Sequence, residues 1–198
     1  KAFSKADGKL VWDASRFDFI QGDAPATVNP SLWRQEKLNN AKGLFKVTDG
    51  IYQVRGYDLA NMTLVEGNTG WIVIDPLLTA EIAKATLAFA LDKLGSKKPV
   101  VAVIYTHSHA DHFGGVRGVI NEADVLAGKV KVIAPEGFMD NAIAENVLAG
   151  NAMTRRATYQ FGNGLDANPR QGVGSGLGKA LSAGTMGLIP PTDTVTDG

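Results

Sequence analysis

The sequence lacks cysteine, has no long apolar run and carries no excess of charge. Because cysteine is absent, a disulfide framework, a thiolate metal site and a cysteine nucleophile are all excluded. No apolar stretch approaches the roughly 20 residues that a membrane-spanning helix needs. The chain has 20 Lys and Arg and 20 Asp and Glu, so its overall charge gives no reason to expect binding to nucleic acid or to an anionic membrane.

Histidine is scarce as well, and its few copies lie in one place. All 3 histidines of the chain fall within residues 106–112, which we call the histidine motif. The motif follows an apolar run over residues 100–105 that predicts a buried strand. Imidazole nitrogens and the carboxylate of Asp111 are ligands that zinc accepts where thiolates are absent. The motif therefore predicts one half of a metal site rather than core or ordinary surface.

The spacing within the motif indicates two metal positions. His107 and His109 are two residues apart at the end of an extended segment, so their rings point the same way and can reach one ion. Asp111 and His112 lie past the bend and can face a second ion. Asp75, at the end of another apolar strand, has two readings: it accepts a ring N–H from one of the histidines, or it only forms a turn before proline.

The hydrophobic patterning predicts an α/β fold. Strands alternate with turns across residues 44–75, and the last of them is apolar enough to be central and covered on both faces. Thr79 then caps a helix over residues 80–94, and the next strand leads into the histidine motif. A strand, a helix and a strand of this length predict a parallel crossover. Ligands of open α/β sheets bind beyond the carboxyl ends of such strands, where the motif lies.

We predict three parts in the chain: an N-terminal arm (residues 1–43), a core (residues 44–161) and a glycine-rich segment (residues 162–198). The arm cannot fold alone, so we expect it to drape over the core or over a second subunit. Its helix, over residues 32–41, is expected to be capped by Ser31.

After the motif, the pattern predicts a strand over residues 130–134 and a helix over residues 135–148 with proline in its first turn. The helix is expected to continue over residues 151–161. The glycine-rich segment is either a flap over a substrate groove, with glycines as hinges, or a surface excursion whose order depends on contacts outside the chain. Its last part, residues 190–198, is predicted to be a connecting loop from which the parent protein continues.

The sequence Thr-His-Ser-His-Ala-Asp-His resembles the HxHxDH signature of the metallo-β-lactamase superfamily. Longer stretches resemble one branch of it, the zinc-dependent alkylsulfatases of the sodium dodecyl sulfate hydrolase type. The stretches that carry this second resemblance are residues 24–35, 61–76, 132–138 and 149–156. The resemblance covers nearly the whole chain and implies a metallo-β-lactamase-like αββα sandwich, of which the chain supplies only the N-terminal part.

The resemblance implies a site that holds two zinc ions when intact. His107 and His109 would bind one ion, and Asp111 and His112 the other. Asp111 is also the predicted catalytic residue. On the first of its two readings above, Asp75 is a second residue behind the ligands that orients a histidine ring. The family completes its site with glutamates and a further histidine later in the chain, whereas this sequence has no histidine after His112.

The implied activity is the hydrolysis of alkyl sulfate esters, such as dodecyl sulfate, to an alcohol and inorganic sulfate by a zinc-activated water. Arg155 and Arg156 either hold the sulfate head or are solvated side chains. Two alternatives stay open. The protein is another hydrolase of the same fold (a lactamase, a thioesterase or a phosphodiesterase), or the chain is a non-catalytic fragment that needs the rest of its protein.

The resemblance further implies a small-molecule substrate and a homodimer at full length, with no nucleic-acid partner and no membrane span. The first residue is Lys1 rather than methionine, so either a leader was removed or the chain was trimmed. With the resemblance, this predicts a periplasmic or secreted protein. The sequence leaves open whether the C–O or the S–O bond breaks and which alkyl sulfates are preferred.

Overall fold

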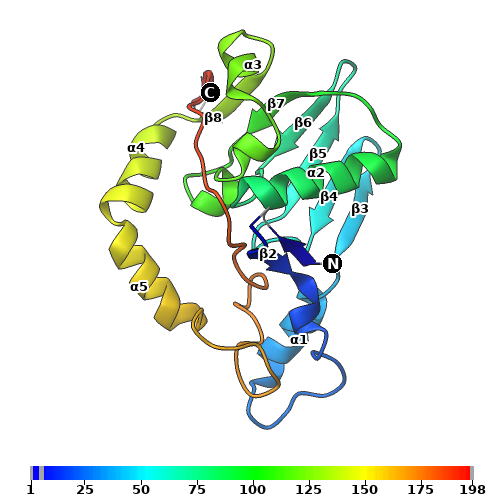
Figure 1. Cartoon of the computed structure of the whole chain (residues 1–198), viewed down its shortest axis with the longest axis vertical. Helices are drawn as coiled ribbons and strands as arrows, with labels where there is room; N and C mark the ends of the chain where they lie inside the picture. Colours follow the sequence, from blue (N-terminus) through cyan, green and yellow to red (C-terminus); the bar gives the residue numbers. More distant parts are fainter. Residues whose placement is uncertain (1, 5–6, 197–198) are drawn as a thin grey trace.

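A seven-stranded mixed sheet forms the centre of the computed structural model, which describes residues 2–4 and 7–196 (Figure 1). Its strands lie side by side in chain order: β3 (Gly43–Thr48), β4 (Ile51–Arg55), β5 (Met62–Glu66), β6 (Trp71–Ile74), β7 (Val100–Ile104), β8 (Lys131–Pro135) and β9 (Asp193–Val195). The strands from β3 to β6 pair antiparallel, and those from β6 to β9 pair parallel. The predicted meander and the central place of β6 are confirmed.

The two faces of the sheet are buried to different degrees. The helix α2 (Ala80–Leu94) makes the predicted parallel crossover from β6 to β7 (Figure 1). In β6, Trp71 and Val73 are buried, whereas the alternate residues are half-buried. Paired strands continue this second face with the half-buried residues Ile51, Val65, Ile72, Ile74, Ile104 and Ile133. The prediction that β6 is covered on both faces is therefore wrong for this chain.

Two predicted helix caps differ in detail. Thr79 occupies the N-cap position of α2, but its side chain makes no capping hydrogen bond and contacts the Ser182 hydroxyl at 2.9 Å instead. In the arm, α1 (Pro30–Asn39) is capped by Asn29, whose side chain accepts a hydrogen bond from the backbone N–H of Ser31. The Ser31 cap is therefore wrong, because proline suits the first helical position and moves the helix start upstream.

The N-terminal arm packs onto the core. It contains β1 (Ala2–Ser4), β2 (Leu10–Asp13) and the 3-10 helix η1 (Ala14–Phe17) in addition to α1. Trp12, Phe17 and Trp33 are buried and belong to the main hydrophobic cluster. The expectation that the arm drapes over a core is confirmed.

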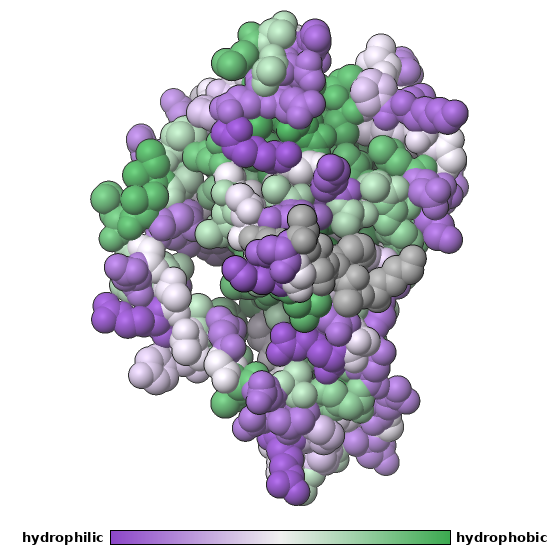
Figure 2. All heavy atoms as spheres, viewed as in Figure 1, coloured by the Kyte–Doolittle hydropathy of each residue, from purple (hydrophilic) through white to green (hydrophobic). Residues whose placement is uncertain are grey.

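Beyond β7, short helices lead into an arch that bows away from the sheet in Figure 1. The short helices are η2 (Ala110–His112), η3 (Val116–Gly118) and α3 (Glu122–Leu126), and the outer arch consists of α4 (Phe138–Ile143), the π-helix η4 (Ala144–Leu148) and α5 (Gly150–Phe161). The predicted helix over residues 135–148 is wrong at its start. Pro135 ends β8, and Gly137 at φ 73° separates the strand from α4. Exposed apolar side chains, including Val147 and Leu148, gather on the arch (Figure 2).

The glycine-rich segment returns from the outer arch to the sheet and is held by contacts within the chain. Lys179 pairs with Glu36 of α1 at 2.8 Å, and both side chains are almost fully buried. The segment ends in β9, which pairs parallel with β8. The predicted connecting loop over residues 190–198 is therefore wrong for Asp193–Val195, because an edge of the sheet orders this short stretch. Among the described residues, no helix combines the length and apolarity needed to cross a bilayer.

Candidate metal centre

The histidine motif lies beyond the carboxyl end of β7, next to the loop that follows the parallel neighbour β6. The rings of His107 and His109 have centroids 4.7 Å apart, and those of His107 and His112 are 4.0 Å apart. The Asp111 carboxylate joins them, with Oδ2 3.3 Å from His112 Nε2. The structure thus brings together the four side chains that the sequence singles out.

Asp75 holds one of these rings from behind. Its Oδ2 lies 2.8 Å from His112 Nδ1 and accepts the Thr106 hydroxyl, also at 2.8 Å. Its Oδ1 accepts the backbone N–H of Thr106 at 2.9 Å. A carboxylate at Nδ1 makes that nitrogen a ring donor, so Nε2 is the nitrogen that carries the lone pair once the ring is neutral. Of the two readings of Asp75, the structure has the one in which it contacts a histidine.

The loop over residues 75–78 is strained. Asp75 at φ 56° and Leu77 at φ 63° are the two described non-glycine residues in the left-handed region. Such residues cost about 1–3 kcal/mol each and persist only where their surroundings hold them. Asp75 N donates to Ile104 O at 3.0 Å, and Gly115 N donates to Leu77 O at 2.8 Å. The loop is therefore fixed between β7 and the end of the motif.

Gly114 and Gly115 are explained by this close packing. A Cβ at Gly114 would lie 2.3 Å from the carbonyl oxygen of Leu78, and one at Gly115 would lie 2.2 Å from that of Pro76. Neither glycine has a positive φ, so the close approach of the backbone, not a left-handed conformation, requires them. Only residues without a side chain let the motif settle against the strained loop.

The pKa values of His107 and His112 shift in opposite directions within the cluster. Burial lowers the pKa of His112, but the hydrogen bonds and charges of Asp111 and Asp75 outweigh burial and raise it to about 9. Burial, followed by the charges of His112 and His109, lowers the pKa of His107. Burial raises the pKa of Asp111, but its hydrogen bond with His112, the charges of His112 and His109 and a backbone hydrogen bond together outweigh burial and lower the pKa. The cluster therefore keeps an ionised carboxylate beside a neutral His107 at neutral pH.

Glu145 is a member of the cluster that sequence reasoning missed. It lies on the π-helix η4, with Oε1 3.1 Å from His109 Nε2, and its Oε2 accepts the Ser108 hydroxyl at 3.2 Å. The neighbouring Asn146 donates from Nδ2 to the carbonyl oxygen of Ser108 at 3.0 Å. Nothing local marks Glu145, because Ser108, whose hydroxyl it accepts, lies 37 residues away in the chain. π-Helical turns are frequent at functional sites, and this one docks the outer arch on the motif.

The donor chemistry of the cluster fits zinc, but the coordination shell is incomplete. Imidazoles and carboxylates without thiolates form an accepted zinc ligand set. Within residues 2–4 and 7–196, however, no three histidine, aspartate or glutamate side chains are arranged so that they could hold one ion together. His109 Nε2 faces Glu145 and His112 Nε2 faces Asp111. The described residues therefore supply a partial ligand set.

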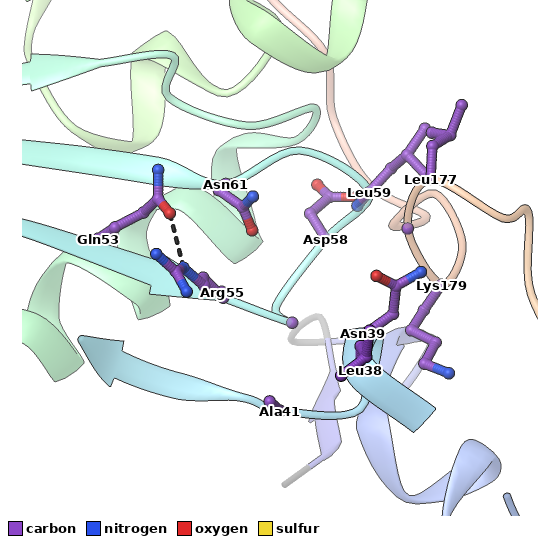
Figure 3. Close-up of a pocket in the computed structure, with 12 residues that line it drawn as sticks. Leu38, Asn39, Ala41, Gln53, Arg55, Asp58, Leu59, Asn61, Leu177 and Lys179 are labelled. Atoms are coloured by element: carbon purple, nitrogen blue, oxygen red, sulfur yellow. Dashed lines mark hydrogen bonds between the residues drawn. The ribbon is translucent and has the colours of Figure 1, made fainter. Parts of the chain in front are cut away.

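Arg155 and Arg156 are exposed on α5, where no residue is buried. A separate hollow of ≈ 270 Å³ lies between α1, β4 and the glycine-rich segment (Figure 3). It is lined by polar side chains such as Arg55 and Asn61 and contains no histidine. The candidate chemistry is thus concentrated at the histidine motif.

A comparison with protein-family models assigns the chain to a superfamily. The model of the metallo-beta-lactamase superfamily matches residues 55–195, a span that includes the sheet from the end of β4 to β9 and the whole cluster. The chain belongs to the metallo-β-lactamase superfamily, as the histidine motif indicates.

Within that family, the chain is similar to alkylsulfatases. A linear primary-alkylsulfatase of Pseudomonas sp is 59% identical over 192 residues, which are 96% of this chain and 28% of that protein. An (R)-specific secondary-alkylsulfatase of Pseudomonas sp is 53% identical over 188 residues, 94% of this chain and 28% of that protein. The solved structure of the stereoselective inverting sec-alkylsulfatase Pisa1 from Pseudomonas sp. matches with a TM-score of 0.93 at 50% identity, covering 99% of this chain and 31% of that one. The chain spans less than a third of the length of these relatives.

Proposed function

We propose that the protein hydrolyses alkyl sulfate esters, such as dodecyl sulfate, to an alcohol and inorganic sulfate at a zinc centre built on the histidine motif. The observation that carries this proposal is the identity of 59% to a linear primary-alkylsulfatase over 96% of the chain. The clustered imidazoles and carboxylates support it, because they are the donors such a centre needs.

We propose that His107 and His109 hold one zinc ion and that Asp111 and His112 hold a second, with two ions in the intact site and Asp111 as the catalytic residue. When bound, zinc supplies Lewis acidity and lowers the pKa of a water to about 7. Asp75 holds Nδ1 of His112, so Nε2 is the nitrogen that would bind zinc once its proton is lost. His107 presents a ring that burial and its neighbours keep neutral by lowering its pKa, as a ligand must be.

The test is sulfate release from an alkyl sulfate that does not unfold the protein. Octyl sulfate below its micelle-forming concentration serves as substrate, and ion chromatography follows sulfate before chelation, after chelation and after zinc is restored. We expect release that chelation abolishes and zinc restores, and no release by His107→Ala. Release that survives chelation, or none under any condition, would contradict the proposal. Repeating the reaction in ¹⁸O-labelled water assigns the broken bond, because the label enters sulfate on S–O cleavage and the alcohol on C–O cleavage.

A second candidate is a metal-poor chain that is not catalytic without further polypeptide. The incomplete ligand set and the half-buried second face of the sheet favour it. The metal content separates the two: close to two zinc ions per chain favours a competent centre, and none or one weakly held ion favours this candidate. The remaining alternative, another hydrolase of the same fold, is tested by adding a β-lactam, a thioester and a phosphodiester to the substrate panel.

The homodimer and the periplasmic or secreted location stay predictions. Light scattering coupled to gel filtration tests the first, and cell fractionation tests the second.

A further inference from the structure

Asp58 is a buried carboxylate outside the histidine cluster that touches three separate parts of the chain. It lies on the turn after β4, beside the segment that carries Leu177 and Lys179 (Figure 3), and is 2% exposed. Its Oδ1 accepts the backbone N–H groups of Leu59 at 2.9 Å and Ser182 at 2.8 Å. Its Oδ2 accepts the backbone N–H of Leu78 at 3.1 Å and the Ser182 hydroxyl at 2.7 Å.

Most of these four hydrogen bonds join Asp58 to distant parts of the chain rather than to its own turn. Only the bond from Leu59 is local, whereas Leu78 lies 20 residues away and Ser182 lies 124 residues away. Burial raises the pKa of Asp58, and its hydrogen bonds oppose that shift. A buried acceptor with four convergent donors fixes the positions of those donors, because each would otherwise be left unpaired.

The bond to Leu78 reaches the strained loop at the end opposite Asp75. At its first residue, the loop holds the His112 ring through the Asp75 carboxylate. At its last residue, the backbone is held by Asp58, and the carbonyl oxygen of Leu78 lies against Gly114. Two residues with positive φ lie in this short stretch, so the loop has other conformations available if either end is released.

We propose that Asp58 is a positioning residue for the histidine cluster: it locks the 75–78 loop from its far end so that Asp75 can fix the His112 ring. The proposal deepens the proposed zinc site and rests on it for its consequence in metal binding. The positioning of the His112 ring by Asp75 and Asp58 does not depend on zinc, so it can be measured in the metal-free protein. Through Ser182, the same carboxylate also holds the glycine-rich segment.

The test uses Asp58→Asn and reads the His112 ring by NMR in the metal-free protein. With 3 histidines in the chain, each ring can be assigned by a single His→Ala substitution. The amide of asparagine puts an N–H group where donors now converge, so we expect the His112 Nδ1–H signal to broaden or vanish. We also expect zinc affinity to fall about tenfold, the lower end of the effect of losing a group that orients a ligand.

Ser182→Ala is the matched control. It removes the hydroxyl that donates to Asp58 and contacts Thr79, but it leaves the Leu78 bond in place. A purely structural role predicts that both variants lose stability and keep the His112 signal. If Asp58→Asn keeps the signal and the zinc affinity, or if Ser182→Ala loses the signal as well, the proposal is overturned.

Amide hydrogen exchange on the unaltered protein decides the matter if Asp58→Asn does not fold. The Leu78 amide bonds Asp58, and the Thr106 amide bonds Asp75. If the loop is locked at both ends, the two amides open as one unit, with protection factors within about threefold of each other. Protection of Thr106 without protection of Leu78 overturns the proposal. Absence of sulfate release from the unaltered protein, with the His112 readouts as expected, would instead count against the proposed function.

Discussion

Removing the positive charge of Lys179 should destabilise the protein far more than removing a surface lysine. Lys179 Nζ lies 2.8 Å from Glu36 Oε2 and donates to Glu36 O at 2.7 Å, and the two side chains are 4% and 0% exposed. Breaking a buried pair by removing one partner leaves a buried charge and costs about 3–5 kcal/mol. Lys179→Met keeps much of the length of the side chain, so the expected loss reports the charge rather than the packing.

Lys98→Met is the matched control for this measurement. Lys98 Nζ lies at the same distance of 2.8 Å from Glu66 Oε1 and also donates to a backbone oxygen, that of Gly67, but its pair is 40% and 38% exposed. Exposed pairs contribute about 0–1 kcal/mol. Urea unfolding followed by tryptophan fluorescence gives both free energies. Equal losses for the two variants would refute the reasoning that burial sets the magnitude.

The double variant Glu36→Leu/Lys179→Met tests whether the stability lost in Lys179→Met comes from the uncompensated charge of Glu36. Replacing a whole buried pair with apolar residues is often neutral or stabilising, so the double variant should recover most of the stability lost in Lys179→Met. If it stays as unstable as the single variant, Glu36 acts through the hydrogen bond that it accepts from Gly176 N at 2.8 Å or through packing, rather than through an uncompensated charge.

Three further predictions concern the candidate metal centre. Asp75→Asn should lower zinc affinity about 10–100-fold, measured by competition with a chelator. The control is Asp49→Asn, because the Asp49 side chain is 96% exposed. Equal affinities of the two variants would count against the role of Asp75. Gly115→Ala should lose about 1–3 kcal/mol or more by overpacking, whereas Gly164→Ala, with nothing within 4 Å of the added Cβ, should stay within about 0.5 kcal/mol. Zinc at about 100 times its Kd should raise the free energy of unfolding by about 2.7 kcal/mol, and an unchanged Tm would contradict zinc binding.

Local patterns predicted the part of the fold that positions the cluster. The strands predicted across residues 44–75 form the antiparallel meander, because alternating apolar residues and turn residues both act over a few positions. The histidine motif could be recognised because its donors are adjacent in the chain. Asp75 could be proposed from its place at the end of an apolar strand, and the structure has it at 2.8 Å from His112.

Long-range contacts account for what the sequence did not reveal. Glu145 reaches the motif across 37 residues, and Lys179 reaches the carbonyl oxygen of Glu36 across 143, so no local spacing marks either. β9 forms only because an edge of the sheet pairs with Asp193–Val195. Proline suits the first turn of a helix, so the sequence predicts a helix start at Pro135, yet Pro135 ends β8.

Zinc content is the measurement that bears on the proposed zinc centre at the histidine motif without any further assumption. Zinc retained per chain after gel filtration is measured by atomic emission for the unaltered protein and for His107→Ala/His109→Ala. We expect zinc in the unaltered protein and its loss from the double variant. Equal zinc in both, or none in the unaltered protein when zinc is supplied, would contradict the proposed zinc centre.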